Sequence, residues 1–106
     1  MKILKTFENY LNSSSADEYI KSVLSKFGLE YEENVHDDAG NLCIKADSRL
    51  HDEDEVLDFI FYIFSSHPNK ENATYHIQFI VNGRIEDEFS TTNLEGSIRS
   101  MIEELR

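Results

Sequence analysis

The alternation of apolar and polar residues around Asn82-Gly83 constrains the fold of this chain more than any other feature. Asn-Gly between two alternating segments is the strongest short-range signal for an antiparallel β-hairpin. A strict two-residue turn would place the two apolar sets on opposite faces, so we expect a three-residue loop or one bulge beside the turn. The expected pairs are Val81 with Ile85 and Ile77 with Phe89, with Tyr75 and Phe79 completing the alternation.

Residues 29–46 predict an earlier hairpin, with residues 37–40 as its loop. Apolar residues alternate on both sides of this loop, so one face of the hairpin can be apolar and the other exposed to solvent. The apolar face would pair Val35 with Leu42, position 33 with Ile44, and Tyr31 with Ala46, while Glu32, Cys43 and Lys45 would lie on the wetter face.

Three helices are indicated outside these hairpins. A short apolar stripe predicts a helix over 1–12. Ser15 followed by Glu18 has capping-box spacing, and Gly28 is a typical helix stop, so a second helix is expected from Ala16 to about Phe27. Thr92 and Glu95 repeat the capping-box spacing ahead of a C-terminal helix, whose apolar face is Leu94, Ile98, Met101, Ile102 and Leu105.

The run from Asp52 to Phe64 predicts a further helix, although residues 59–64 are β-prone by composition. Four acids at 52–55 suit the positive end of a helix dipole, and Pro68 would end the segment. The apolar stripe would be Val56, Leu57, Ile60, Ile63 and Phe64. The remaining aromatic residues fall outside that stripe, so the helix would be covered on two sides or would expose aromatic surface.

Together these elements predict a single α+β domain over 1–106, a two-layer sandwich with helices on one face of a four-stranded antiparallel sheet. The element order is ααββαββα, in which 29–66 and 74–106 could be paired ββα units. The expected core is Ile20, Leu24, Phe27, Tyr31, Ile44, Ile60, Ile63, Ile77, Phe79, Ile85, Phe89, Ile98 and Leu105.

Negative charge is concentrated in residues 30–58, which carry −9 of the formal net charge of −11. Such a segment repels nucleic acid and anionic membranes, and it favours a basic partner surface, a cation or simple solubility. Direct nucleic-acid binding is disfavoured further because the ten cations are dispersed along the chain. The single cysteine, Cys43, cannot form an internal disulfide, and no signal peptide or membrane span is evident, so a soluble cytoplasmic protein is expected.

No reactive constellation emerges, so no catalytic, cofactor-binding or metal-binding residue is predicted. His36-Asp37-Asp38 and the run 51–55 contain ligand types without ligand spacing. Phe27-Gly28-Leu29 and Asp38-Ala39-Gly40-Asn41-Leu42 resemble the helix-to-strand entry of zinc aminopeptidases of the co-catalytic type, over residues 17–46. The His-x-Asp metal pair of that family has no counterpart at His51-Asp52, so the resemblance implies no site residue and we expect neither bound metal nor hydrolytic turnover.

The sequence favours a small non-enzymatic binding protein, of the inhibitor or immunity type found in phages and mobile elements. It would present carboxylates to the basic groove of a nuclease, another nucleic-acid-processing enzyme or a toxin, with aromatic anchors adding affinity. The alternative is a structural or regulatory module that self-associates, as a homodimer, through the aromatic helix 56–64. The predicted partner-binding residues are Glu30, Glu32, Glu33, Asp37, Asp38, Asp52, Glu53, Asp54, Glu55, Asp58, Phe61 and Tyr62.

Overall fold

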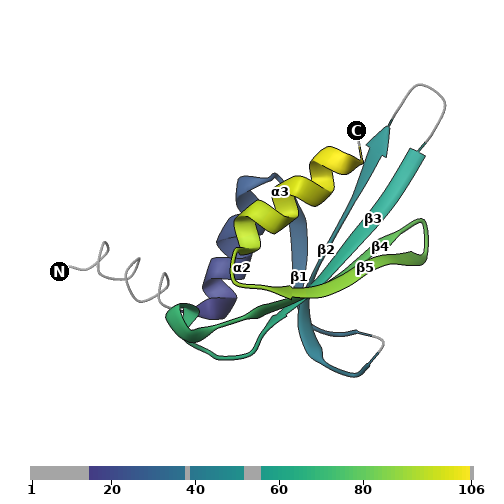
Figure 1. Ribbon diagram of the computed structural model, residues 1–106. Helices are drawn as coiled ribbons and strands as arrows, with labels where there is room; N and C mark the ends of the chain where they lie inside the picture. The colour runs from purple at the N-terminus through teal and green to yellow at the C-terminus, as the bar shows by residue number, and fades with distance from the viewer. Residues whose placement is uncertain (1–14, 38, 52–55, 106) are drawn as a thin grey trace.

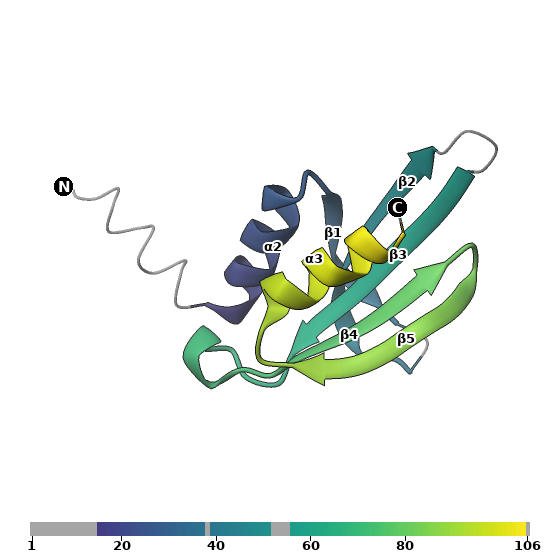
Figure 2. The same cartoon turned by 45° about the horizontal axis from the view of Figure 1, so that its top comes forward.

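The structure, a computed structural model, describes residues 15–37, 39–51 and 56–105. It is an α+β fold whose five antiparallel strands form one sheet in the order β1-β2-β3-β4-β5. Both helices lie across the same face of the sheet, and no described helix covers the other face (Figures 1 and 2). The elements are α2 (Ala16–Lys26), β1 (Glu30–His36), β2 (Leu42–His51), β3 (Val56–Ser65), the short 3₁₀ helix η1 (Lys70–Asn72), β4 (Tyr75–Val81), β5 (Arg84–Thr91) and α3 (Leu94–Glu104).

The predicted helix from Asp52 to Phe64 is wrong, because residues 56–65 form β3 at the centre of the sheet. Aromatic and β-branched residues pack well on a pleated surface, and a central strand satisfies its backbone groups through β2 on one side and β4 on the other. The α+β class and the antiparallel sheet are confirmed. The four-stranded sheet and the order ααββαββα are wrong. The segment 29–66 contains three strands where a ββα unit was expected, and the predicted helix 1–12 lies outside the described residues.

Helix α2 follows its sequence signals at both ends. The Ser15 side chain accepts a hydrogen bond from the backbone N–H of Glu18, at 3.3 Å, as the capping-box spacing predicted. Gly28 adopts a φ of 75° just beyond the helix, a backbone conformation that side chains with a Cβ rarely tolerate. The buried face of α2 is Ala16, Ile20, Val23 and Leu24.

The β1–β2 hairpin keeps only part of its predicted register. Tyr31 pairs with Ala46 as expected, but Val35 pairs with Cys43 rather than with Leu42. The shift arises at a bulge around Asn34, which has a φ of 60°. The assignment of Tyr31 to the core is wrong: β1 is an edge strand, and Tyr31 remains 38% exposed although it has the predicted partner.

The β4–β5 hairpin has the predicted irregularity in a different place. Ile77 pairs with Phe89 as expected, but the Asn82-Gly83 turn is a strict two-residue turn that pairs Val81 with Arg84. The register then shifts between Phe79 and Ile80, and this bulge restores the apolar alignment. Ile85 pairs with Ile80 and is 52% exposed on the face away from the helices, so its assignment to the core is wrong.

The core lies between the two helices and the central strands. Of the thirteen core residues predicted, those of α2, α3 and the helix-facing positions of β2, β3 and β4 are confirmed as buried. Phe27, Phe89 and Leu105 pack against the core while partly buried, and Ile60 faces away from it. The confirmed residues are Ile20, Leu24, Ile44, Ile63, Ile77, Phe79 and Ile98.

Helix α3 is capped by Asn93 rather than by the predicted Thr92. The Asn93 side chain accepts a hydrogen bond from the backbone N–H of Gly96, at 3.1 Å. We expect Asn93→Ala to lower the free energy of unfolding by about 0.5–2 kcal/mol in urea titrations, because one backbone donor of the first turn loses its acceptor. Thr92→Ala, one residue earlier and exposed, is the matched control and should be nearly neutral. A larger loss for Thr92→Ala would contradict the assigned cap.

Candidate partner-binding face

The face of the sheet away from the helices is the candidate functional surface, and we call it the open face. Cross-strand partners share a face, so the pairings assign each side chain to one side of the sheet. On β3, Phe59, Phe61 and Ile63 are buried against the helices, which puts the alternate residues Ile60 and Tyr62 on the open face. A sheet with one solvated face normally carries polar residues there. This sheet departs from that pattern.

Five apolar or aromatic side chains form a continuous surface on the open face, which we call the apolar strip. Along β3 it runs through three alternate residues, and across the sheet Ile60 pairs with Ile80, which in turn pairs with Ile85. All of these side chains are partly or fully exposed to solvent. The strip exists because β3 is apolar at every position from 59 to 64, so it presents apolar groups to both sides. Its members are Ile60, Tyr62, Phe64, Ile80 and Ile85.

Carboxylates flank the apolar strip on both sides. Toward β1 and β2 they outnumber the cations, and Arg49 on β2 is already bound to Asp58 on β3, with Nε and Oδ1 2.6 Å apart. Lys45 pairs with Tyr62 on one side and with Glu32 on the other. The open-face carboxylates of the described strands are Glu30, Glu32, Asp47, Asp58 and Glu88. Asp47 and Glu88 were not among the partner-binding residues predicted from the sequence. The strand register places them on the open face, because Asp47 pairs with Ile60, and Glu88 pairs with Gln78, the partner of Tyr62.

The structure brings together four of the predicted partner-binding residues. Glu30, Glu32, Asp58 and Tyr62 all lie on the open face. The prediction that Phe61 binds a partner at the surface is wrong, because its side chain is 0% exposed and packs beneath the helices. Asp38, Asp52, Glu53, Asp54 and Glu55 lie outside the described residues.

Two other predicted acids have roles within the fold. Glu33 lies at the β1 bulge and accepts a hydrogen bond from Lys21 of α2 at 3.0 Å, and Glu18 and Glu33 together raise the pKa of that lysine. Asp37 accepts hydrogen bonds from the backbone N–H groups of Ala39 and Asn41. Burial pushes the pKa of Asp37 upward, but the hydrogen bonds from Asn41 and Ala39 outweigh it and hold that pKa below its ordinary value.

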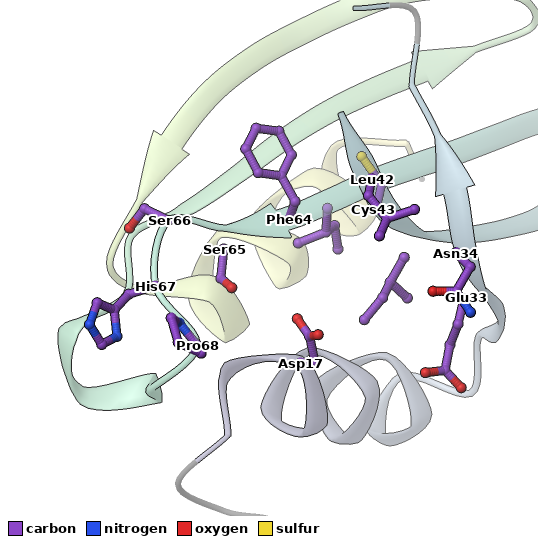
Figure 3. A pocket seen from close by; sticks show the side chains of 12 residues that line it. Asp17, Glu33, Asn34, Leu42, Cys43, Phe64, Ser65, Ser66, His67 and Pro68 are labelled. Atoms are coloured by element: carbon purple, nitrogen blue, oxygen red, sulfur yellow. The ribbon is translucent and has the colours of Figure 1, made fainter. Parts of the chain in front are cut away.

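A pocket of about 260 Å³ lies between α2 and strands β1, β2 and β3, and the only cysteine of the chain, Cys43, is among the residues that line it. In Figure 3 the Asp17 carboxylate rises from α2 toward the end of β3, while the His67 ring points away from the cavity. Cys43 is buried, and burial, followed by the charge of Asp37, raises the pKa of its thiol to about 12. The thiol therefore stays protonated at neutral pH and is a poor nucleophile. His36 pairs with Leu42, so it faces the opposite side of the sheet from Cys43 and cannot act as its base.

The part of the chain that the structure describes contains neither a metal-ligand cluster nor a membrane-spanning helix. Within residues 15–37, 39–51 and 56–105, no group of three or more His, Cys, Asp or Glu side chains is arranged to hold a metal ion. Neither α2 nor α3, each 11 residues long, has the length and apolarity needed to cross a bilayer. Comparisons of the chain with protein-family models, with curated proteins and with solved structures find no match.

Proposed function

We propose that this chain is a non-enzymatic binding protein whose open face docks onto a basic protein surface. The observation that carries the proposal is the apolar strip, which lies on an uncovered sheet face and is flanked by carboxylates. An exposed apolar patch bordered by polar groups is typical of protein interaction sites. Apolar and aromatic groups supply affinity at the centre of an interface, while charges at its rim set the partner and the rate of encounter.

The charge of the face favours a basic partner over a second copy of this chain. Among the residues of the described strands, five open-face carboxylates stand against two cations, and one of those cations, Arg49, forms an ion pair with Asp58. Two copies stacked through this face would bring like-charged rims together, and the whole chain carries a net charge of −11. A groove lined by Lys and Arg would complement the same rim. Such grooves bind phosphates in nucleic-acid-processing enzymes and in toxins that act on nucleic acids, which supports an inhibitor or immunity role.

The test uses two synthetic peptides of equal charge, one alternating Arg with Leu and the other alternating Arg with Ser. We expect the Arg–Leu peptide to bind at least about tenfold more tightly by isothermal titration calorimetry, because only it can cover the apolar strip. The double variant Ile60→Thr/Ile85→Thr should lose that preference and retain the circular dichroism spectrum of the parent. Association should also slow as ionic strength rises from 0.01 M to 0.15 M, where the Debye length falls from ~30 Å to ~8 Å.

Leu42→Thr is the matched control, since Leu42 is also an exposed apolar residue of the sheet but lies outside the strip. It should bind both peptides as the parent does. Equal affinity of the parent for the two peptides would show that charge alone drives binding, and this result would contradict the proposal. A dimer seen by sedimentation and removed by Ile60→Thr/Ile85→Thr would assign the face to self-association instead.

A further inference from the structure

A pocket of about 290 Å³ lies on the open face, where the β1–β2 turn meets strands β3, β4 and β5. Pockets that enclose whole small molecules start at roughly 300 Å³. At about 290 Å³ this pocket is at that lower limit, and it has room for a single side chain of a larger partner. No Lys or Arg is present among the described residues that line it. The lining combines aromatic rings, carboxylates and two amides: Asp37, Asn41, Tyr62, Phe64, His76, Gln78 and Glu88.

One of these two amides is buried: Gln78 is only 6% exposed in the middle of β4. Its Nε2 donates a hydrogen bond to Oε2 of Glu88 at 3.3 Å, but its Oε1 has no hydrogen-bond partner among the described residues. A buried acceptor without a donor is unfavourable. Glu88 is exposed on the edge strand β5, so its side chain can shift to admit a donor that contacts both groups.

Flat aromatic surface and negative charge surround this amide. The rings of Phe64 and His76 stack with their centroids 4.7 Å apart and their planes within 22°. Tyr62 is the cross-strand partner of Gln78 on β3, and Glu88 is its partner on β5. Ring faces attract cations, and the carboxylates of Asp37 and Glu88 add negative charge at the same pocket.

We propose that this pocket binds the guanidinium group of an arginine side chain from the basic partner. A guanidinium is planar, so it can lie against the ring faces while its five donors reach Gln78 Oε1 and the Glu88 carboxylate together. An ammonium is a compact point charge and cannot make both contacts in one plane. The inference rests on the proposed function and names the side chain that would anchor the partner.

The test follows the backbone amide signals of Gln78 and Glu88, and the side-chain amide signal of Gln78, by NMR during titration at pH 7.5. The probes are N-acetyl-arginine methylamide, the corresponding lysine compound and the neutral citrulline compound. We expect saturable shifts with the arginine probe, about tenfold weaker binding of the lysine probe and no binding of citrulline. Glu88→Gln and Gln78→Met should each weaken binding of the arginine probe by about tenfold.

Glu86→Gln is the matched control, because it makes the same charge change on the same exposed strand without lining the pocket. It should change the affinity by less than about twofold. Equal losses in Glu86→Gln and Glu88→Gln, or equal binding of the arginine and lysine probes, would overturn the assignment. If Glu88→Gln leaves arginine binding intact while Ile60→Thr/Ile85→Thr abolishes peptide binding, the arginine pocket is refuted. The same result would support the open face as the docking surface.

Discussion

Phe61→Ala should lower the free energy of unfolding by about 3–5 kcal/mol. The Phe61 ring is fully buried, stacks on Phe79 with centroids 4.8 Å apart, and meets Phe59 edge-on at 5.7 Å. Truncation would remove these contacts and leave a cavity that the surrounding β-sheet cannot close. A domain of this size is stable by only about 5–15 kcal/mol, so the variant should be near the limit of folding. Urea titration monitored by circular dichroism measures the loss.

Phe64→Ala is the control on the same strand. Phe64 has the opposite parity and is only partly buried on the open face, where it stacks on His76. The same truncation there should cost about 1 kcal/mol, since a partly exposed ring loses less of its burial and leaves no enclosed cavity. A larger loss for Phe64→Ala than for Phe61→Ala would mean that the two faces of β3 are exchanged.

Tyr75→Phe should raise the free energy of unfolding by about 1–3 kcal/mol. Tyr75 is 2% exposed, and its hydroxyl has no hydrogen-bond partner in the described part of the chain. Burial is the main cause that raises the pKa of this phenol, with smaller contributions from Tyr19 and Asp17. Removing the hydroxyl removes a buried polar group and keeps the ring in place. The same urea titration measures the gain.

Tyr19→Phe provides the comparison for that gain. The rings of Tyr19 and Tyr75 are in contact, with centroids 5.7 Å apart, but Tyr19 is only partly buried. Its hydroxyl can be solvated, so its removal should leave stability nearly unchanged. If Tyr75→Phe proves destabilising, the hydroxyl of Tyr75 has a hydrogen-bond partner in solution, and the expected gain is refuted.

Features that depend only on residues adjacent in the sequence could be predicted from the sequence alone. The Ser15 cap, the Gly28 stop and the Asn82-Gly83 turn are each set by the chemistry of a few adjacent positions, and the structure contains all three. The pairs Tyr31–Ala46 and Ile77–Phe89 were also predicted, because alternation over a hairpin requires only local sequence. The cap of α3 was missed by one residue, since Thr92 and Asn93 are both good capping residues.

Elements whose structure depends on strands distant in the sequence could not be predicted from the local sequence. Residues 56–65 satisfy a helical stripe and a strand composition equally well, and the choice is made by β2 and β4, which hydrogen-bond to both edges of β3. The two bulges also follow from the sheet, because the twist and packing of neighbouring strands determine where an extra residue is accommodated.

In the candidate site, too, some features follow from the sequence alone and others depend on contacts between distant segments. The sequence alone determined that the chain is acidic, that its charge is concentrated in residues 30–58 and that it can form an antiparallel α+β fold. Only the tertiary structure decided that Phe61 is buried while Tyr62 faces outward, and that the Gln78–Glu88 pair of the β4–β5 hairpin lies beside Tyr62 of β3. The physical reason is that a strand apolar on both sides has no inherent inner face, so the helices that cover one side of the sheet leave the other available for a partner.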